Sequence, residues 1–280
     1  MTLVEAIVLG VLQGLTEFLP VSSSGHLILA ESFMKLNVET LKSFDVAVHF
    51  GTLLAIFIYF RRDFAHLIRG CANLINGSIS LILHRKDRSA KKKEGLESTK
   101  MIGYLAVATV PAVLVGAFFS DFLEAQFRNA TSVAVMLIIV GVLFFVAEYV
   151  AVRVKHSGFN LKNTVLIGIA QACALIPGVS RSGATISTGL ASGIRREDAA
   201  RFSFLLGSIA IAAATALSVY KVAKGEFALP ATDVLLTGIA ASFVSGYAAI
   251  SFLMKFLKKH TLHVFGIYRV ILGFAILFLF

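Results

Sequence analysis

Six long apolar stretches set the strongest limit on what this chain can fold into. They lie at about 44–60, 101–119, 131–152, 199–220, 232–252 and 262–280. A bilayer has a hydrocarbon core about 30 Å thick, which a helix of about 20 apolar residues can cross. The composition agrees, because 57% of the residues are hydrophobic and only 15% are charged, against about 25% charged in soluble proteins. We therefore expect an all-α polytopic membrane protein with about six transmembrane helices.

Composition also excludes other classes of protein. The two cysteines, Cys71 and Cys173, have neither the number nor the spacing of a disulfide framework or a zinc site. The formal net charge of +10 is a feature shared with proteins that bind nucleic acid. A membrane protein that keeps its basic residues on one face of the bilayer is basic for a simpler reason. We expect membrane lipid around this chain and no nucleic-acid partner.

Two further apolar stretches, about 3–36 and 160–194, are interrupted near their middles by LPVSSSG and IPGVSRSG. Proline, glycine and serine together end one helix and begin another. Non-helical backbone at membrane depth is tolerated only when it is buried in protein or lines a wet cavity. Each stretch is therefore predicted to be a re-entrant hairpin of two half-helices. The segment at about 63–83 is too polar for a confident span and is predicted to lie along the membrane interface.

The two interrupted stretches form an internal repeat. Val21-Ser22-Ser23-Ser24-Gly25 aligns with Val179-Ser180-Arg181-Ser182-Gly183, and each is preceded by a proline and, further back, by a glutamine. The spans that follow also correspond, at Phe50-Gly51-Thr52 and Leu206-Gly207-Ser208. The chain is thus predicted to be a single integral membrane domain, 1–280, with repeat halves at about 1–155 and 156–280.

Each half has one hairpin and three full crossings, so the second half is expected to be inverted relative to the first. In such inverted repeats, broken helices meet near the midplane and direct their N-termini at a bound anion. Nineteen of the 26 basic residues fall on the side of a predicted basic loop at about 61–100. That side is expected to be cytoplasmic. The first hairpin then enters from outside and the second from inside.

Candidate functional residues concentrate at the first interruption. Gln13 and Glu17 are four residues apart and are predicted to share one helix face. A carboxylate within a membrane segment costs about 2.5–3.5 kcal/mol on insertion scales, which favours a functional role. The alternative is a glutamate at a hairpin mouth exposed to water. The residues that open the second half-helix offer hydroxyls, free N–H groups and a helix dipole to a phosphate, or act only as an N-cap: Ser22, Ser23, Ser24, Gly25 and His26.

Arg181 is the candidate at the second interruption. A guanidinium at membrane depth needs a partner, and its fork matches the non-bridging oxygens of a phosphate. The alternative is a structural ion pair with Glu17. Thr185, one turn further on, offers a hydroxyl on the same face, or it packs. Arg269 is predicted to lie near a helix end or to pair locally, outside the site.

These two stretches, from Gln13 to His26 and from Pro177 to Thr185, resemble the signature stretches of the bacterial undecaprenyl-diphosphate phosphatase family. The resemblance extends over nearly the whole chain, although Gln13 stands where some members carry an acidic residue. It implies an inner-membrane enzyme that hydrolyses undecaprenyl diphosphate to the monophosphate and inorganic phosphate. It also implies recycling of the lipid carrier for cell-wall synthesis, dependence on a divalent cation and bacitracin resistance.

Chemistry and this resemblance together suggest roles for the residues. A Mg²⁺ or Ca²⁺ ion is expected on the oxygens of Glu17 and Gln13, with Arg181 neutralising the rest of the diphosphate charge. Ser23 is the expected nucleophile, activated by His26; alternatively His26 attacks and Ser23 only binds. Expected substrate-binding residues are Ser22, Ser24, Gly25, Ser180, Ser182 and Thr185. The catalytic cavity is expected to open to the outer face, and a homodimer is compatible with the sequence.

A secondary transporter or a lipid flippase with an anion site at the broken helices is the alternative function. Such proteins share inverted repeats and broken helices. The combination of Ser23, His26, Glu17 and Arg181 favours an enzyme, because a carrier of anions does not require a nucleophile and a base beside its binding site.

Overall fold

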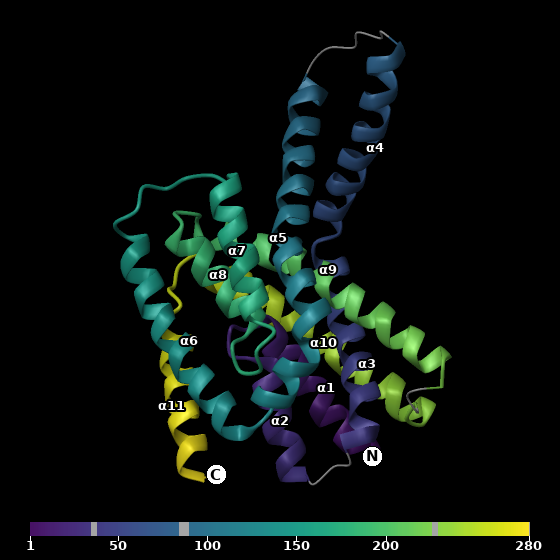
Figure 1. Ribbon diagram of the computed structural model, residues 1–280, viewed down its shortest axis with the longest axis vertical. Coiled ribbons are helices and arrows are strands. Elements are labelled where there is room, and N and C mark those ends of the chain that lie inside the picture. The colour runs from purple at the N-terminus through teal and green to yellow at the C-terminus, as the bar shows by residue number, and fades with distance from the viewer. Residues whose placement is uncertain (35–37, 84–89, 226–228, 280) are drawn as a thin grey trace.

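The computed structural model describes residues 1–34, 38–83, 90–225 and 229–279. All regular structure in these ranges is α-helical, which confirms the expected all-α class (Figure 1). The helices are α1 (Leu3–Phe18), α2 (Ser23–Met34), α3 (Val38–Tyr59), α4 (Arg61–Leu83), α5 (Ala90–Phe127), α6 (Ala130–Ala151), α7 (Leu161–Cys173), α8 (Arg181–Ala191), α9 (Arg196–Ala223), α10 (Thr232–Phe256) and α11 (His263–Leu279).

Every predicted span lies in a helix. Judged by length and composition, four helices in the described part of the chain can cross a membrane alone: the Glu97–Phe127 part of α5, α6, α9 and α10. Phe44–Tyr59 of α3 and Arg61–Ala72 of α4 meet this test as a pair, bent by 79°. Helix α11 is apolar and shorter, at 17 residues. The chain is therefore a multi-pass membrane protein.

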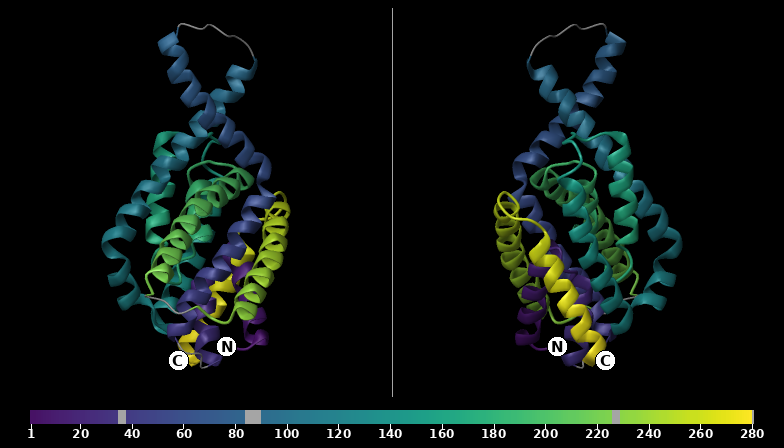
Figure 2. Two further views of the ribbon diagram at one scale, coloured as in Figure 1. Left: turned by 90° about the vertical axis from the view of Figure 1, so that its right-hand side faces the viewer. Right: turned by 90° about the vertical axis from the view of Figure 1, so that its left-hand side faces the viewer.

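Both interrupted stretches are helix–turn–helix hairpins. Helix α1 ends at Phe18 and α2 begins at Ser23, while α7 ends at Cys173 and α8 begins at Arg181. The α1–α2 hairpin opens toward the end that holds both chain termini, and the α7–α8 hairpin opens toward the opposite end (Figures 1 and 2). The prediction of two hairpins is confirmed, and they point in opposite directions, as an inverted repeat requires.

The two turns share an unusual backbone conformation at equivalent repeat positions. Ser22 and Ser180 have φ angles of 78° and 72°, and they are the non-glycine residues with positive φ in the described ranges. Each serine hydroxyl accepts a hydrogen bond from the N–H three residues later, at Gly25 (3.3 Å) and Gly183 (3.2 Å). Each turn thus begins its second half-helix in the same way.

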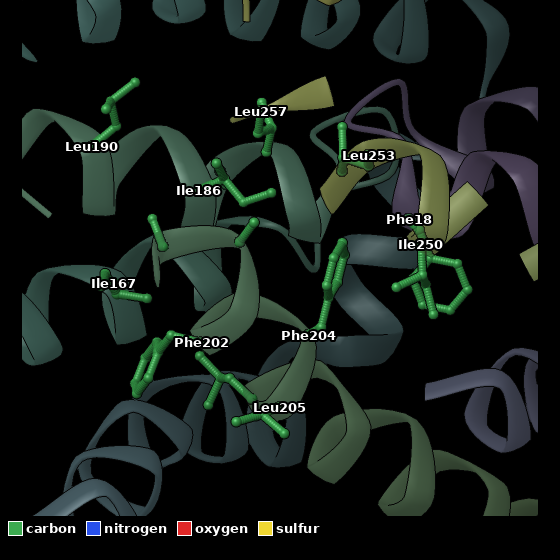
Figure 3. Packing of buried hydrophobic residues seen from close by; sticks show 14 of the residues in the cluster. Phe18, Ile167, Ile186, Leu190, Phe202, Phe204, Leu205, Ile250, Leu253 and Leu257 are labelled. Atoms are coloured by element: carbon green, nitrogen blue, oxygen red, sulfur yellow. The ribbon is translucent and has the colours of Figure 1, made fainter. Parts of the chain in front are cut away.

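Side chains from both halves make the main core. Phe18 of α1 meets Phe204 of α9 edge-on, with ring centroids 5.5 Å apart. Ile186 of α8 and Ile250 of α10 belong to the same cluster (Figure 3). Because lipid is as apolar as these side chains, close packing is what holds such helices together. Phe18 directly follows Glu17, so its burial fixes the direction in which the carboxylate points.

The predictions for residues 61–100 need correction. Where a loop was expected, α4 and the first part of α5 are helical, and they project together beyond the other helices (Figure 1). Helix α4 therefore does not lie across the end of the bundle as an interfacial helix would. The reason is its pairing with α5: a Cβ on Gly70 would lie 3.0 Å from the Cβ of Ser98. Each helix thereby supplies the other with a packing partner.

Candidate active site

Glu17, in the last turn of α1, is the meeting point of the two hairpins. Its side chain is buried, and Oε2 accepts hydrogen bonds from Gln13 Nε2 (3.0 Å) and Ser23 Oγ (2.8 Å). Nη2 of Arg181 lies 2.5 Å from Oε1, and Nε2 of His49 lies 3.7 Å from Oε2. One carboxylate therefore joins residues from α1, α2, α3 and α8.

Gln13 lies one helical turn before Glu17, and the hydrogen bond between them confirms that they share a face. Gln13 is completely buried. Its amide nitrogen is used by Glu17, while Oε1 has no hydrogen-bond partner among the described residues. A buried acceptor without a partner is costly. This oxygen is therefore available to a ligand.

Arg181, the first residue of α8, crosses the face of α9 to reach Glu17. Its Nη1 donates to the carbonyl of Ser203 at 3.2 Å, and its side chain is 14% exposed. Gly207 of α9 makes this path available, because a Cβ there would overlap the guanidinium. The ion pair that the sequence left as an alternative is present, and it places a cation at the centre of the site.

The other predicted substrate-binding residues divide by exposure. Ser22, Ser180, Ser182 and Thr185 are buried in this structure. The Thr185 hydroxyl donates to the carbonyl of Arg181 at 2.8 Å and lies 2.6 Å from Ser203 Oγ, so it joins α8 to α9. Gly25 is also buried, whereas Ser24 is exposed. Ser24 is thus the serine of the first turn that a ligand reaches most easily.

His26 lies beside the first turn, with both ring nitrogens engaged. Nδ1 lies 2.8 Å from the carbonyl of Ser22, and Nε2 lies 2.7 Å from the hydroxyl of Tyr268. A carbonyl only accepts, so Nδ1 carries a proton, and in the neutral ring Nε2 accepts from Tyr268. The Ser23 hydroxyl donates to Glu17 instead. Activation of Ser23 by His26 stays a prediction, and the base in contact with Ser23 is Glu17.

Three residues near the site were not assigned to it from sequence. His49 is an ionisable group inside a predicted span, which is a recognisable signal in hindsight. Tyr268 gives no such signal. The prediction for Arg269 is wrong, because this residue is fully buried in α11 and bonds to the distant carbonyls of Pro20 and Gly178.

A cavity of about 340 Å³ reaches the site. Its lining includes Ser24, His49 and Pro177, together with Arg128 and Lys221 at the ends of α5 and α9. Arg128 is paired there with two acidic residues of the lining, Asp45 and Glu124. Those helix ends lie toward the chain termini, opposite the projecting α4 and α5 (Figure 2). Apolar side chains such as those of Leu27, Ile28 and Leu217 share the lining. The cavity therefore suits a polar headgroup that carries an apolar tail.

Two oxygen donors at the site could hold a hard metal ion. No group of three or more His, Cys, Asp or Glu side chains gathers anywhere in the part of the chain that the structure describes. Glu17 offers a carboxylate, and Gln13 offers the unpartnered Oε1. Mg²⁺ is commonly held by one or two carboxylates together with phosphate oxygens of a substrate. The two residues fit a cation of that kind.

Comparison with known proteins gives matches over nearly the full length. The family described as bacitracin resistance protein BacA matches residues 6–275. An undecaprenyl-diphosphatase of Rubrobacter xylanophilus is 43% identical, covering 95% of this chain and 94% of its own length. Undecaprenyl-diphosphatases of Alcanivorax borkumensis (38% identical, 98% of this chain, 97% of its own) and Pelotomaculum thermopropionicum (36% identical, 100% and 97%) match similarly.

Proposed function

Because this chain belongs to the family of bacitracin resistance protein BacA, we propose that it is an undecaprenyl-diphosphatase. It hydrolyses undecaprenyl diphosphate to undecaprenyl phosphate and inorganic phosphate, the activity for which its relatives are named. The single observation that carries this proposal is the convergence of Ser23, Arg181 and His49 on the buried carboxylate of Glu17. A nucleophile, a base and a cation within one site are what phosphoryl transfer requires.

The hydroxyl of Ser23 is the proposed nucleophile. Its Oγ attacks the terminal phosphorus while its proton passes to Glu17, 2.8 Å away. The bond from that phosphorus to the bridging oxygen breaks, and undecaprenyl phosphate leaves with the bridging oxygen. Water then hydrolyses the phosphoserine and releases inorganic phosphate. Direct attack by Nε2 of His26 is the alternative, and it requires Tyr268 to give up its hydrogen bond.

Arg181 supplies the charge that the phosphoryl group needs. The guanidinium presents several donors in one plane, so it can hold Glu17 with one nitrogen and a phosphate oxygen with another. The N-termini of α2 and α8 add the positive ends of two helix dipoles. These groups are fixed before substrate enters, which is the arrangement that stabilises a transition state most effectively.

We also propose that the reaction uses Mg²⁺ or Ca²⁺. Glu17 and Oε1 of Gln13 would hold the cation together with oxygens of the diphosphate. When bound, the cation would neutralise charge on the phosphate groups. The residues of this chain perform the proton transfer and orient the nucleophile.

We place the protein in the bacterial inner membrane with the site open to the outer face. The basic residues concentrate at the end where α4 and α5 project, and basic segments stay in the cytoplasm. The cavity lies toward the other end, where it would receive carrier lipid released outside. Hydrolysis there would return the lipid carrier to cell-wall synthesis. It would also consume the diphosphate form of the lipid, which is the target of bacitracin. The prenyl tail would lie against apolar helix faces.

The test is phosphate release by the purified protein in detergent micelles with undecaprenyl diphosphate. We expect inorganic phosphate and the lipid monophosphate in equal amounts, and little of either from Glu17→Gln. A protein that releases no phosphate under these conditions, yet moves the lipid between leaflets of a vesicle, would instead be a flippase.

A further inference from the structure

Arg269 is the largest fully buried side chain in the described structure, with none of its surface exposed. It lies in α11, well inside the helix. Its guanidinium donates to the carbonyls of Gly178 (2.8 Å) and Val179 (3.1 Å) in the second turn, and to the carbonyl of Pro20 (3.3 Å) in the first. One side chain therefore binds the backbone of both turns.

The hydrogen bonds of this guanidinium all go to main-chain carbonyls. Besides the two turns, it reaches the carbonyls of Met136 and Leu137 of α6, each at 3.4 Å. Broken helices leave carbonyls without helical partners, and a buried cation needs acceptors around its charge. The guanidinium supplies donors to the turn carbonyls, and these carbonyls supply acceptors to the buried charge. A lysine offers one ammonium, which cannot reach separate carbonyls in the way that the planar fork does.

The turn carbonyls that Arg269 binds lie one or two residues before the strained serines. Pro20 is two residues before Ser22, and Val179 is immediately before Ser180; both serines have positive φ, which L residues rarely adopt. Ser23 and Arg181 come next in the chain, and both bond to Glu17. A shift of either turn would therefore move one of these two groups away from the carboxylate.

We propose that Arg269 is a positioning residue of the reaction. It joins the two turns at their carbonyls so that Ser23 and Arg181 reach the same carboxylate. This role rests on the proposed phosphatase activity. Arg269 has no hydrogen bond to Glu17 in the described structure and does not line the cavity, so it acts through the two turns.

The first experiment measures phosphate release and thermal unfolding of Arg269→Lys in detergent. We expect kcat to fall by about thirtyfold while KM changes by less than about threefold, because orientation rather than binding is lost. Arg196→Lys is the matched control. Arg196 also holds together parts of the chain that are far apart in sequence, through the buried carboxylate of Glu148 at the other end of the protein. Its change should leave kcat near the wild-type value.

A double variant separates positioning from a general structural role. If Arg269 acts by placing Arg181, then Arg269→Lys should cost much less in an Arg181→Lys protein than in the wild type. Independent losses that multiply would overturn the proposal, as would a wild-type kcat in Arg269→Lys. Wild-type protein that releases no phosphate would instead overturn the proposed function.

Gly141→Ala decides the matter if Arg269→Lys does not fold. A Cβ on Gly141 would lie 2.9 Å from Val270 and 3.3 Å from the Cβ of Arg269, so it displaces α11 while the arginine is kept. We expect a lower kcat with unchanged KM. A folded Gly141→Ala protein with full kcat would contradict the proposal.

Discussion

Nη2 of Arg181 lies 2.5 Å from Oε1 of Glu17, although the two residues are 164 positions apart and belong to opposite hairpins. The site therefore exists only where the two halves of the repeat dock. The two turns share their backbone conformation, but the side chains at equivalent positions differ. By the repeat alignment, Arg181 takes the place of Ser23, and Leu175 takes the place of Glu17. One turn supplies the hydroxyl and the other supplies the cation.

Gly207→Ala is expected to lower the rate of phosphate release by at least about tenfold, because transition-state contacts depend on precise placement. The added methyl group would overlap the Arg181 guanidinium, which must then leave its path to Glu17. Alanine is a better helix former than glycine by about 1 kcal/mol, so helix propensity gives no reason for a loss of stability.

Gly103→Ala is the control for this change. Nothing lies within 4 Å of a Cβ at Gly103 of α5, and the variant should be as active as the wild type. The measurements are initial rates and thermal unfolding in detergent. A folded Gly207→Ala protein with the wild-type rate would show that Arg181 tolerates a different position.

Local sequence signals were sufficient for the hairpins and for part of the site. Proline, glycine and serine at the two interruptions mark helix breaks by backbone chemistry alone. The spacing of Gln13 and Glu17 determines their shared face, because residues four apart lie one helical turn away. Interactions over such short distances in the chain need no knowledge of the tertiary fold.

The contacts that α11 makes with the two turns could not be predicted from local sequence signals. Tyr268 meets His26 across 242 positions of sequence, and Arg269 meets Pro20 across 249. Both depend on how α11 packs against α6, where a Cβ on Gly273 would lie 2.8 Å from the carbonyl of Ala134. The prediction that Arg269 lies near a helix end or pairs locally failed because its partners are carbonyls of distant turns, which broken helices make available.

Chelation is expected to abolish activity, and Mg²⁺ or Ca²⁺ to restore it, because Glu17 and Gln13 offer oxygen ligands of the kind these ions prefer. Gln13→Leu removes the unpartnered Oε1 and should raise the metal concentration needed for half-maximal rate by about tenfold. Gln171→Leu is the matched control, since Gln171 is the buried counterpart in the second hairpin with no carboxylate one turn later. Full activity in excess chelator would exclude the metal.

A cysteine at position 24 should react with a membrane-impermeant thiol reagent in intact cells, since Ser24 is exposed and lines the cavity proposed to open outward. Position 22 is not suitable, because Ser22 is completely buried. The background must lack Cys71 and Cys173, which are both exposed. The control is Glu97→Cys, in the cavity at the opposite end, which should label only after permeabilisation. The reverse pattern of labelling would invert the proposed orientation.

The covalent intermediate is expected on Ser23. Its Oγ lies 2.8 Å from Glu17, whereas both ring nitrogens of His26 have other partners. Acid quenching of the reaction with labelled diphosphate should therefore trap a phosphoserine, which survives acid, and Ser23→Ala should trap nothing. An acid-labile adduct that disappears in His26→Gln would make the histidine the nucleophile.

Substituting Arg181 separates its two candidate roles. If the guanidinium holds Glu17 and a phosphate oxygen together, Arg181→Lys keeps the charge and loses the fork, so it should be nearly as damaging as Arg181→Ala. The loss of such a transition-state contact is worth about 3 kcal/mol, or roughly a hundredfold in rate. If Arg181 serves only to pair with Glu17, lysine should suffice for activity. Alanine would then leave a buried carboxylate unpaired and lower the melting temperature. Rates and melting temperatures of both variants distinguish these outcomes, and a well-folded Arg181→Lys protein with a near-normal rate would remove Arg181 from the catalytic residues.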